Sequence, residues 1–207
     1  MKCFSISMLC AVLFLAEAPV IAGDDGEKLP FNPVKICRLS LDGKPRSISI
    51  RQGGDVWLGY DVEKAAVFKV WQAPEGKPGL KITSFKATSA GTSLFDKKDV
   101  EGWQMTRNGK TEPLTVSYLG CTQTGDSFEL SWELNPTGGK ITLTERVPST
   151  PGSNTDRAYR ELRVESLKAG ESLSPSPGDG NAWVVTDPAG KSVSSISGAG
   201  WYRLSLP

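Results

Sequence analysis

The chain has 207 residues, of which 24 are Lys or Arg, 23 are Asp or Glu and none is His. The formal net charge of +1 gives no electrostatic reason to expect nucleic acid or an anionic membrane surface as a partner. The absence of histidine excludes His-dependent triads, His-ligated metal sites and covalently attached c-type haem, so we expect neither a cofactor nor a metal. The 22 glycines and 14 prolines, beside 38% hydrophobic residues, favour a turn-rich all-β domain.

The N-terminal segment has the pattern of a secretory signal peptide. A basic start precedes the apolar run Met8–Leu15, and the small residue Ala22 precedes the expected cleavage point. The apolar run is too short for a membrane span. We therefore expect residues 1–22 to be removed, 23–33 to form a polar leader, and 34–207 to form one domain outside the cytoplasm, periplasmic or secreted.

Two cysteines remain after that cleavage, Cys37 and Cys121. In an oxidising compartment the default expectation for such a pair is a disulfide. The bridge would close a loop of roughly 85 residues and stabilise the fold by about 4 kcal/mol in the chain-entropy model. The alternative is a pair of buried free thiols, and the sequence leaves it open.

Strand-like alternation of polar and apolar residues runs through the rest of the chain. The clearest case is Ser127–Leu134, where Phe128, Leu130, Trp132 and Leu134 share one face. A period of two over such a length is typical of a half-buried antiparallel strand. Further strands are expected at 37–41, 46–51, 56–60, 67–71, 80–85, 114–119, 141–147, 158–167, 182–186 and 201–206. Many short strands separated by turn residues predict an antiparallel β-sandwich of one domain, with the supersandwich as a variant of that class.

Three segments in order have a familiar pattern: Leu41–Arg46 (L-D-G-K-P-R), Val56–Asp61 (V-W-L-G-Y-D) and Phe68–Trp71 (F-K-V-W). They resemble an extracytoplasmic β-domain of planctomycete and verrucomicrobial proteins, whose pattern runs "L-D-G-K-P-R … L-W-x-A-Y-D-x-x-x-C-x-L-Y-K-V-W". The resemblance extends over about residues 40 to 170. It also includes Tyr118–Gly120, Phe128–Leu134, Ile141–Arg146 and Arg160.

The resemblance implies the role of an accessory domain and does not imply a particular reaction. In that family the domain often accompanies c-type cytochrome modules or propeller domains that resemble sugar dehydrogenases. A c-type cytochrome or a dehydrogenase is therefore an expected partner protein. Ala66 stands where the family pattern often has cysteine, and this chain has no haem motif of its own.

Aromatic residues are the first candidates for ligand contact. Trp57 shares parity with Gly59 and Asp61, which predicts that it lies on the less buried face of its strand, and Trp71 is interpreted in the same way. Trp103 is expected in a loop. Exposed indole rings stack on sugars, so these three tryptophans are candidate carbohydrate contacts, with core packing as the alternative.

Charged residues supply two other candidate groups. A glycoside hydrolase needs two carboxyl groups across a cleft, but Glu129 and Glu133 lie on the outer face of one strand, where solvated charge is the ordinary explanation. Glu145 and Arg160, by contrast, occupy inward positions of neighbouring strands. Because a buried charge is costly without a partner, we expect these two to form a structural ion pair, with a polar pair in a ligand site as the alternative.

These observations favour a secreted, non-catalytic binding or assembly module that is associated with carbohydrate or with a periplasmic redox or sugar-processing protein. One alternative is a sugar-active enzyme of the supersandwich type found in aldose epimerases, although those enzymes rely on histidine. A purely structural envelope protein is the other alternative.

Overall fold

The computed structural model describes residues 35–149, 157–175 and 183–207. The expected signal peptide and leader lie outside these residues. The described residues form strands, bridges and turns, so the expectation of an all-β protein with antiparallel sheets is confirmed. Within them, no helix is long and apolar enough to cross a membrane.

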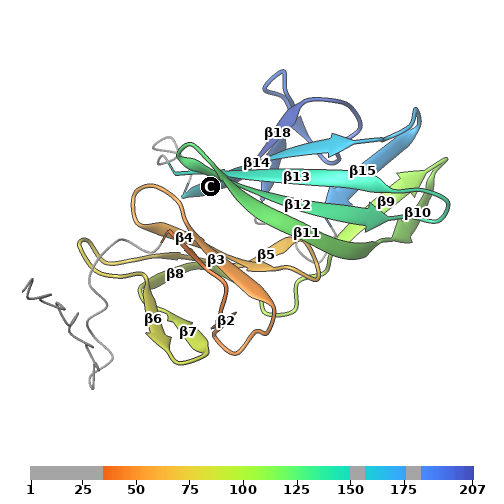
Figure 1. Ribbon diagram of the computed structural model, residues 1–207. Coiled ribbons are helices and arrows are strands. Elements are labelled where there is room, and N and C mark those ends of the chain that lie inside the picture. The colour runs from red at the N-terminus through yellow and green to blue at the C-terminus, as the bar shows by residue number, and fades with distance from the viewer. Residues whose placement is uncertain (1–34, 150–156, 176–182) are drawn as a thin grey trace, which may run out of the picture.

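A five-stranded antiparallel sheet forms the middle layer of the molecule (Figure 1). Its spatial order is β1-β3-β4-β5-β8, and β4 pairs with β5 so that Trp57 lies opposite Trp71. The bounds are β1 (Ile36–Cys37), β3 (Ser47–Arg51), β4 (Val56–Asp61), β5 (Ala66–Gln72) and β8 (Thr92–Asp96).

A seven-stranded antiparallel sheet packs over one face of this layer, in the order β11-β12-β13-β14-β18-β16-β17. The alternation of Ser127–Leu134 has the expected outcome, since Phe128, Leu130, Trp132 and Leu134 are all buried. The bounds are β11 (Thr115–Thr124), β12 (Ser127–Asn135), β13 (Ile141–Pro148), β14 (Ala158–Glu165), β16 (Val184–Thr186), β17 (Ser192–Val193) and β18 (Trp201–Leu206).

Two three-stranded sheets complete the fold. One has the order β2-β7-β6, and its β2–β7 pair is parallel, unlike every other pairing of the described strands. The other has the order β10-β9-β15, and it contains Trp103, which was expected in a loop. The bounds are β2 (Ser40–Leu41), β6 (Leu80–Thr83), β7 (Lys86–Ser89), β9 (Trp103–Arg107), β10 (Lys110–Pro113) and β15 (Glu171–Pro175).

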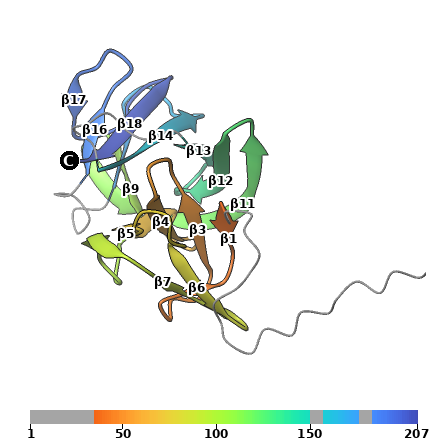
Figure 2. The same cartoon turned by 90° about the vertical axis from the view of Figure 1, so that its left-hand side faces the viewer.

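The five-stranded sheet therefore separates two hydrophobic cores. Figures 1 and 2 show the long strands β11–β14 on one side of it and β6 and β7 on the other. The large core lies between the five-stranded and seven-stranded sheets and includes Leu58, Tyr60 and Trp132. The small core lies on the opposite face and consists of Cys37, Leu41, Trp57, Ala66, Phe68, Trp71, Ala73, Leu80, Ala87 and Val100.

Candidate functional site

Trp57 and Trp71 belong to the small core and are not surface residues. Their exposed fractions are 3% and 1%, and their rings stack with centroids 5.8 Å apart and planes 13° from parallel. The Trp71 indole N–H donates a 2.7 Å hydrogen bond to the Gly79 carbonyl. Neither ring presents a face to solvent, so the interpretation of these two residues as sugar-stacking contacts is corrected to core packing.

The parity argument failed at these positions because both faces of β4 are covered. In a sheet with one solvated face, alternate residues are exposed. Here the sheet β2-β7-β6 covers the second face, and every residue of β4 is buried. Trp57 does point away from the large core, as its parity indicates, but it points into the small core.

The two cysteines are free in the structure, which corrects the expected disulfide. Cys37 belongs to the small core, whereas Cys121 on β11 packs against the large core. The segments approach each other, since an Arg38 terminal nitrogen lies 3.5 Å from the Cys121 carbonyl oxygen. The side chains nevertheless belong to different cores, on opposite sides of the five-stranded sheet. Burial raises the pKa of both thiols.

Glu145 and Arg160 meet inside the large core. Arg160 Nη1 on β14 lies 3.2 Å from both carboxylate oxygens of Glu145 on β13. The Tyr60 hydroxyl on β4 donates to the same carboxylate, so the group joins the two large sheets. The exposed fractions of Tyr60, Glu145 and Arg160 are 0%, 0% and 4%. The expected ion pair is thus present in the structure and has a third member that the sequence did not indicate.

Burial and pairing act in opposite directions on this group. Burial raises the pKa of Glu145, while Arg160 and the hydrogen bond from Tyr60 partly oppose the rise. Burial, followed by the nearby carboxylate, raises the pKa of Tyr60, so this phenol stays protonated. The carboxylate can therefore accept from two donors without leaving a buried anion unsatisfied.

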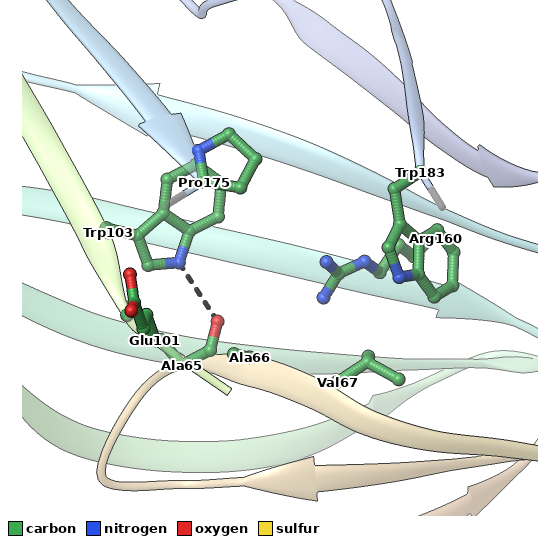
Figure 3. A pocket seen from close by; sticks show the side chains of 9 residues that line it. Ala65, Ala66, Val67, Glu101, Trp103, Arg160, Pro175 and Trp183 are labelled. Carbon is green, nitrogen blue, oxygen red and sulfur yellow. Dashed lines mark hydrogen bonds between the residues drawn. The ribbon is translucent and has the colours of Figure 1, made fainter. Parts of the chain in front are cut away.

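A pocket lies next to this group (Figure 3). The empty space of the pocket, including the open solvent at its mouth, is about 320 Å³. Trp103 and Trp183 stand at opposite sides of it, and the Arg160 guanidinium points into the space between them. The remaining lining residues are Ala65, Ala66, Val67, Glu101, Gly102 and Pro175.

Both indole rings are held in place. The Trp103 N–H donates a 3.0 Å hydrogen bond to the Ala65 carbonyl, and Trp103 is 3% exposed. Trp183 packs under the Arg160 guanidinium, whose Cζ lies 4.7 Å from the ring centroid, and meets Phe95 edge-on at 6.2 Å. Trp103, unlike the other two tryptophans singled out from the sequence, therefore lines a cavity, although it does so from a strand rather than a loop.

The pocket combines apolar walls with unused hydrogen-bond donors. Arg160 Nε is buried and has no hydrogen-bond partner among the described residues. Its Nη1 donates to the Glu145 carboxylate, and Tyr60 is a further hydrogen-bond neighbour of the guanidinium. A guanidinium carries five N–H donors, so several remain for a ligand or water. No cluster of three or more His, Cys, Asp or Glu side chains in the described ranges could hold a metal ion.

The carboxylates considered for hydrolysis are occupied elsewhere. Glu129 accepts from Arg146 at 2.8 Å, and Glu133 accepts from Lys140 at 3.0 Å, both on the outer face of the seven-stranded sheet. These are the solvated, paired charges that strand parity indicates.

Sequence reasoning missed Trp183 and Tyr60 as neighbours of Arg160. Trp183 is two residues before Val185 and so is expected on the same, inward face. This pattern predicts that Trp183 is buried, but it does not predict that Trp183 contacts Arg160. Only the approach of β4 to β13 and β14 brings Tyr60 to the pair.

No protein-family model matches this chain, and no curated protein matches it either.

Proposed function

We propose that this chain is a non-catalytic carbohydrate-binding module that works outside the cytoplasm. The observation that supports this function best is the pocket between Trp103 and Trp183, into which the buried Arg160 guanidinium points and where its Nε has no hydrogen-bond partner among the described residues. Sugar sites combine apolar surface for the C–H groups of the ring with polar groups for its hydroxyls. Trp103 and Trp183 are 3% and 8% exposed, so they supply the edges of the pocket walls and not open stacking faces. The signal-like segment 1–22 supports the location.

The rigidity of the pocket favours binding over catalysis. The Trp103–Ala65 hydrogen bond and the Arg160–Trp183 stack fix the walls before a ligand arrives. Such preorganisation reduces the ordering cost of binding. Arg160 does not titrate at physiological pH and so supplies donors, not proton transfer.

Titration of the full chain with a panel of neutral methyl hexosides, followed by tryptophan fluorescence and calorimetry, tests this function. Trp183→Ala should weaken binding by about tenfold or more, because aromatic anchors dominate such sites. Trp201→Ala is the matched control, since Trp201 lies on the outer face over Arg146 and Arg163.

A second variant tests the site without removing a side chain that packs in the pocket wall. Gly102 lines the pocket, and a Cβ placed there would meet its nearest neighbour, the Lys64 carbonyl, at 3.4 Å. Gly102→Leu should therefore fold and obstruct the pocket. Absence of binding by the wild-type chain, or unchanged binding by both pocket variants, would refute a carbohydrate site here.

The location has its own test. N-terminal sequencing of the chain from its native envelope should begin at Gly23. Retention of Met1 would contradict an extracytoplasmic protein.

A second candidate function is assembly with a c-type cytochrome or a dehydrogenase. One observation favours it: Phe85, at the turn between β6 and β7, is 83% exposed. Large exposed apolar side chains are common at protein interfaces. An immobilised wild-type chain that retains a haem- or dehydrogenase-containing protein, where Phe85→Ser retains none, would support assembly; equal retention would contradict it.

A further inference from the structure

The enclosed part of the pocket is small. It has room for about one water-sized group, while the rest of its volume opens at the mouth. A whole hexose ring cannot enter it. The space accepts a single substituent of a ring that rests across the mouth, between the edges of Trp103 and Trp183.

The charges around the pocket cancel. The positive charge of Arg160 is already paired with Glu145 at 3.2 Å. At the rim, the Glu101 carboxylate belongs to the lining, and Lys64 lies beside Gly102. Among these described residues no net positive charge is left over, so a ligand carboxylate would be desolvated without a counter-charge of its own, which is unfavourable.

The donors that remain suit a neutral acceptor. Arg160 is 4% exposed, its guanidinium is fixed by Glu145 on one side and by the Trp183 ring on another, and its terminal nitrogens point into the space (Figure 3). A hydroxyl oxygen accepts such a hydrogen bond without adding charge. The same hydroxyl can also donate, which a carboxylate cannot.

We propose that the pocket recognises one hydroxyl-bearing substituent of an uncharged sugar, with Arg160 as its donor, and discriminates against the corresponding uronic acid. This inference rests on the proposed function and specifies its ligand class. Glu101, whose exposed side chain lies at the rim, is the residue that we expect to contribute to the discrimination.

Matched sugar pairs test the inference directly. Methyl glucoside is compared with methyl glucuronide, and methyl galactoside with methyl galacturonide, by calorimetry on the full chain. These pairs differ only in the exocyclic group, hydroxymethyl or carboxylate. The neutral member of at least one pair should bind about tenfold more tightly than its acid, the scale expected for one unfavourable charge contact.

Two exposed carboxyl variants locate the cause. Glu101→Gln should reduce the neutral-over-acid ratio severalfold, while Glu75→Gln, outside the pocket, should leave it unchanged. An acid that binds as tightly as its neutral partner, or more tightly, overturns the inference but leaves a carbohydrate site in place. Failure of all four sugars to bind defeats the proposed function itself, and binding that survives Gly102→Leu shows that the sugar lies elsewhere.

Discussion

The two cores on either side of the five-stranded sheet share its strands but differ in the polarity of their side chains. The large core contains the buried group Tyr60–Glu145–Arg160, whose members are all at most 4% exposed. The small core is apolar, with the stacked Trp57 and Trp71 rings as its largest side chains. In the large core, the buried charge has partners from both large sheets.

The difference shows what charge inside a sandwich requires. Arg160 has a carboxylate within hydrogen-bond distance and an aromatic ring beneath it. Around the small core, ionic contacts lie at the edge: Lys69 lies 2.7 Å from Asp42, and the buried Asp61 is paired with the partly exposed Lys44 at 2.8 Å. We therefore expect the large core to be sensitive to charge and the small core to be sensitive to volume.

Glu145→Gln should be the most damaging change. It keeps the size of the side chain but leaves the Arg160 charge buried without a counter-charge, and breaking a buried pair in this way costs about 3–5 kcal/mol of unfolding free energy. Chemical denaturation at neutral pH measures the loss. A cost below about 1 kcal/mol would contradict the importance of the pair.

Arg160→Met is the matched comparison, and it should cost less. Glu145 can take up a proton, whereas Arg160 cannot release one. Burial raises the pKa of Glu145, and without Arg160 the rise should be larger. An acid whose pKa is raised in the folded state destabilises the fold as pH rises through that value. The Arg160→Met chain should therefore be relatively more stable below the ordinary Glu pKa and lose stability as pH increases.

Gly79→Ala tests the volume sensitivity of the small core. An added Cβ would lie 2.0 Å from the Trp57 indole nitrogen and 2.4 Å from its Cδ1. Because Trp57 is held against Trp71, overpacking should cost about 1–3 kcal/mol of unfolding free energy. Gly120→Ala is the control, since a Cβ there meets nothing within 4 Å. Equal effects of the two variants would contradict a tightly packed small core.

Asp42→Asn tests the ionic rim and should have a smaller effect, about 1 kcal/mol at neutral pH. Asp42 accepts from Lys69 on β5 and from Ser89 on β7, and so links the small sheet to the five-stranded sheet. Burial by itself would raise the pKa of Asp42, but these hydrogen bonds outweigh it and lower the pKa.

The sign of the pH dependence follows from that lowered pKa. The stabilisation is present above the ordinary Asp pKa of about 3.9 and is lost as pH falls through the lower folded value. Asp42→Asn should flatten this acid limb in denaturation curves measured from pH 7 downwards. Exposed Asp99→Asn is the control and should leave the limb unchanged. The same acid limb in all three proteins would contradict the contribution of Asp42.

Sequence patterns predicted the features that depend on one strand or on one strong constraint. The alternation of Ser127–Leu134 fixes its inward face, and the cost of burying a charge predicts the Glu145–Arg160 pair. The short strands β7 to β10 were missed because they are short and largely polar and form only through their neighbours.

The sequence of a strand does not predict which other elements pack against it. Trp57 points where its parity indicates, yet it is buried, because β6 and β7 come from later in the chain and cover that face. The pocket likewise depends on β5, β9, β14 and β15 meeting beside Trp183. Alternation therefore predicts orientation, whereas exposure depends on which sheets pack together.

The two cysteines test whether the five-stranded sheet separates the two cores, and this test is expected to involve little change in stability. Cys37 lies in the small core and Cys121 against the large core, so each should be a free thiol. In denatured, unreduced protein, Cys37→Ala should contain one thiol fewer than the wild type, and so should Cys121→Ala. A bridge between them would give the opposite result, because removing one partner would release the other and raise the count.

In the native protein Cys37, which is 7% exposed, should react more slowly with a thiol reagent than the half-buried Cys121, since burial both blocks access and raises the pKa. Equal native rates would mean that the small core opens as readily as the edge of the large one.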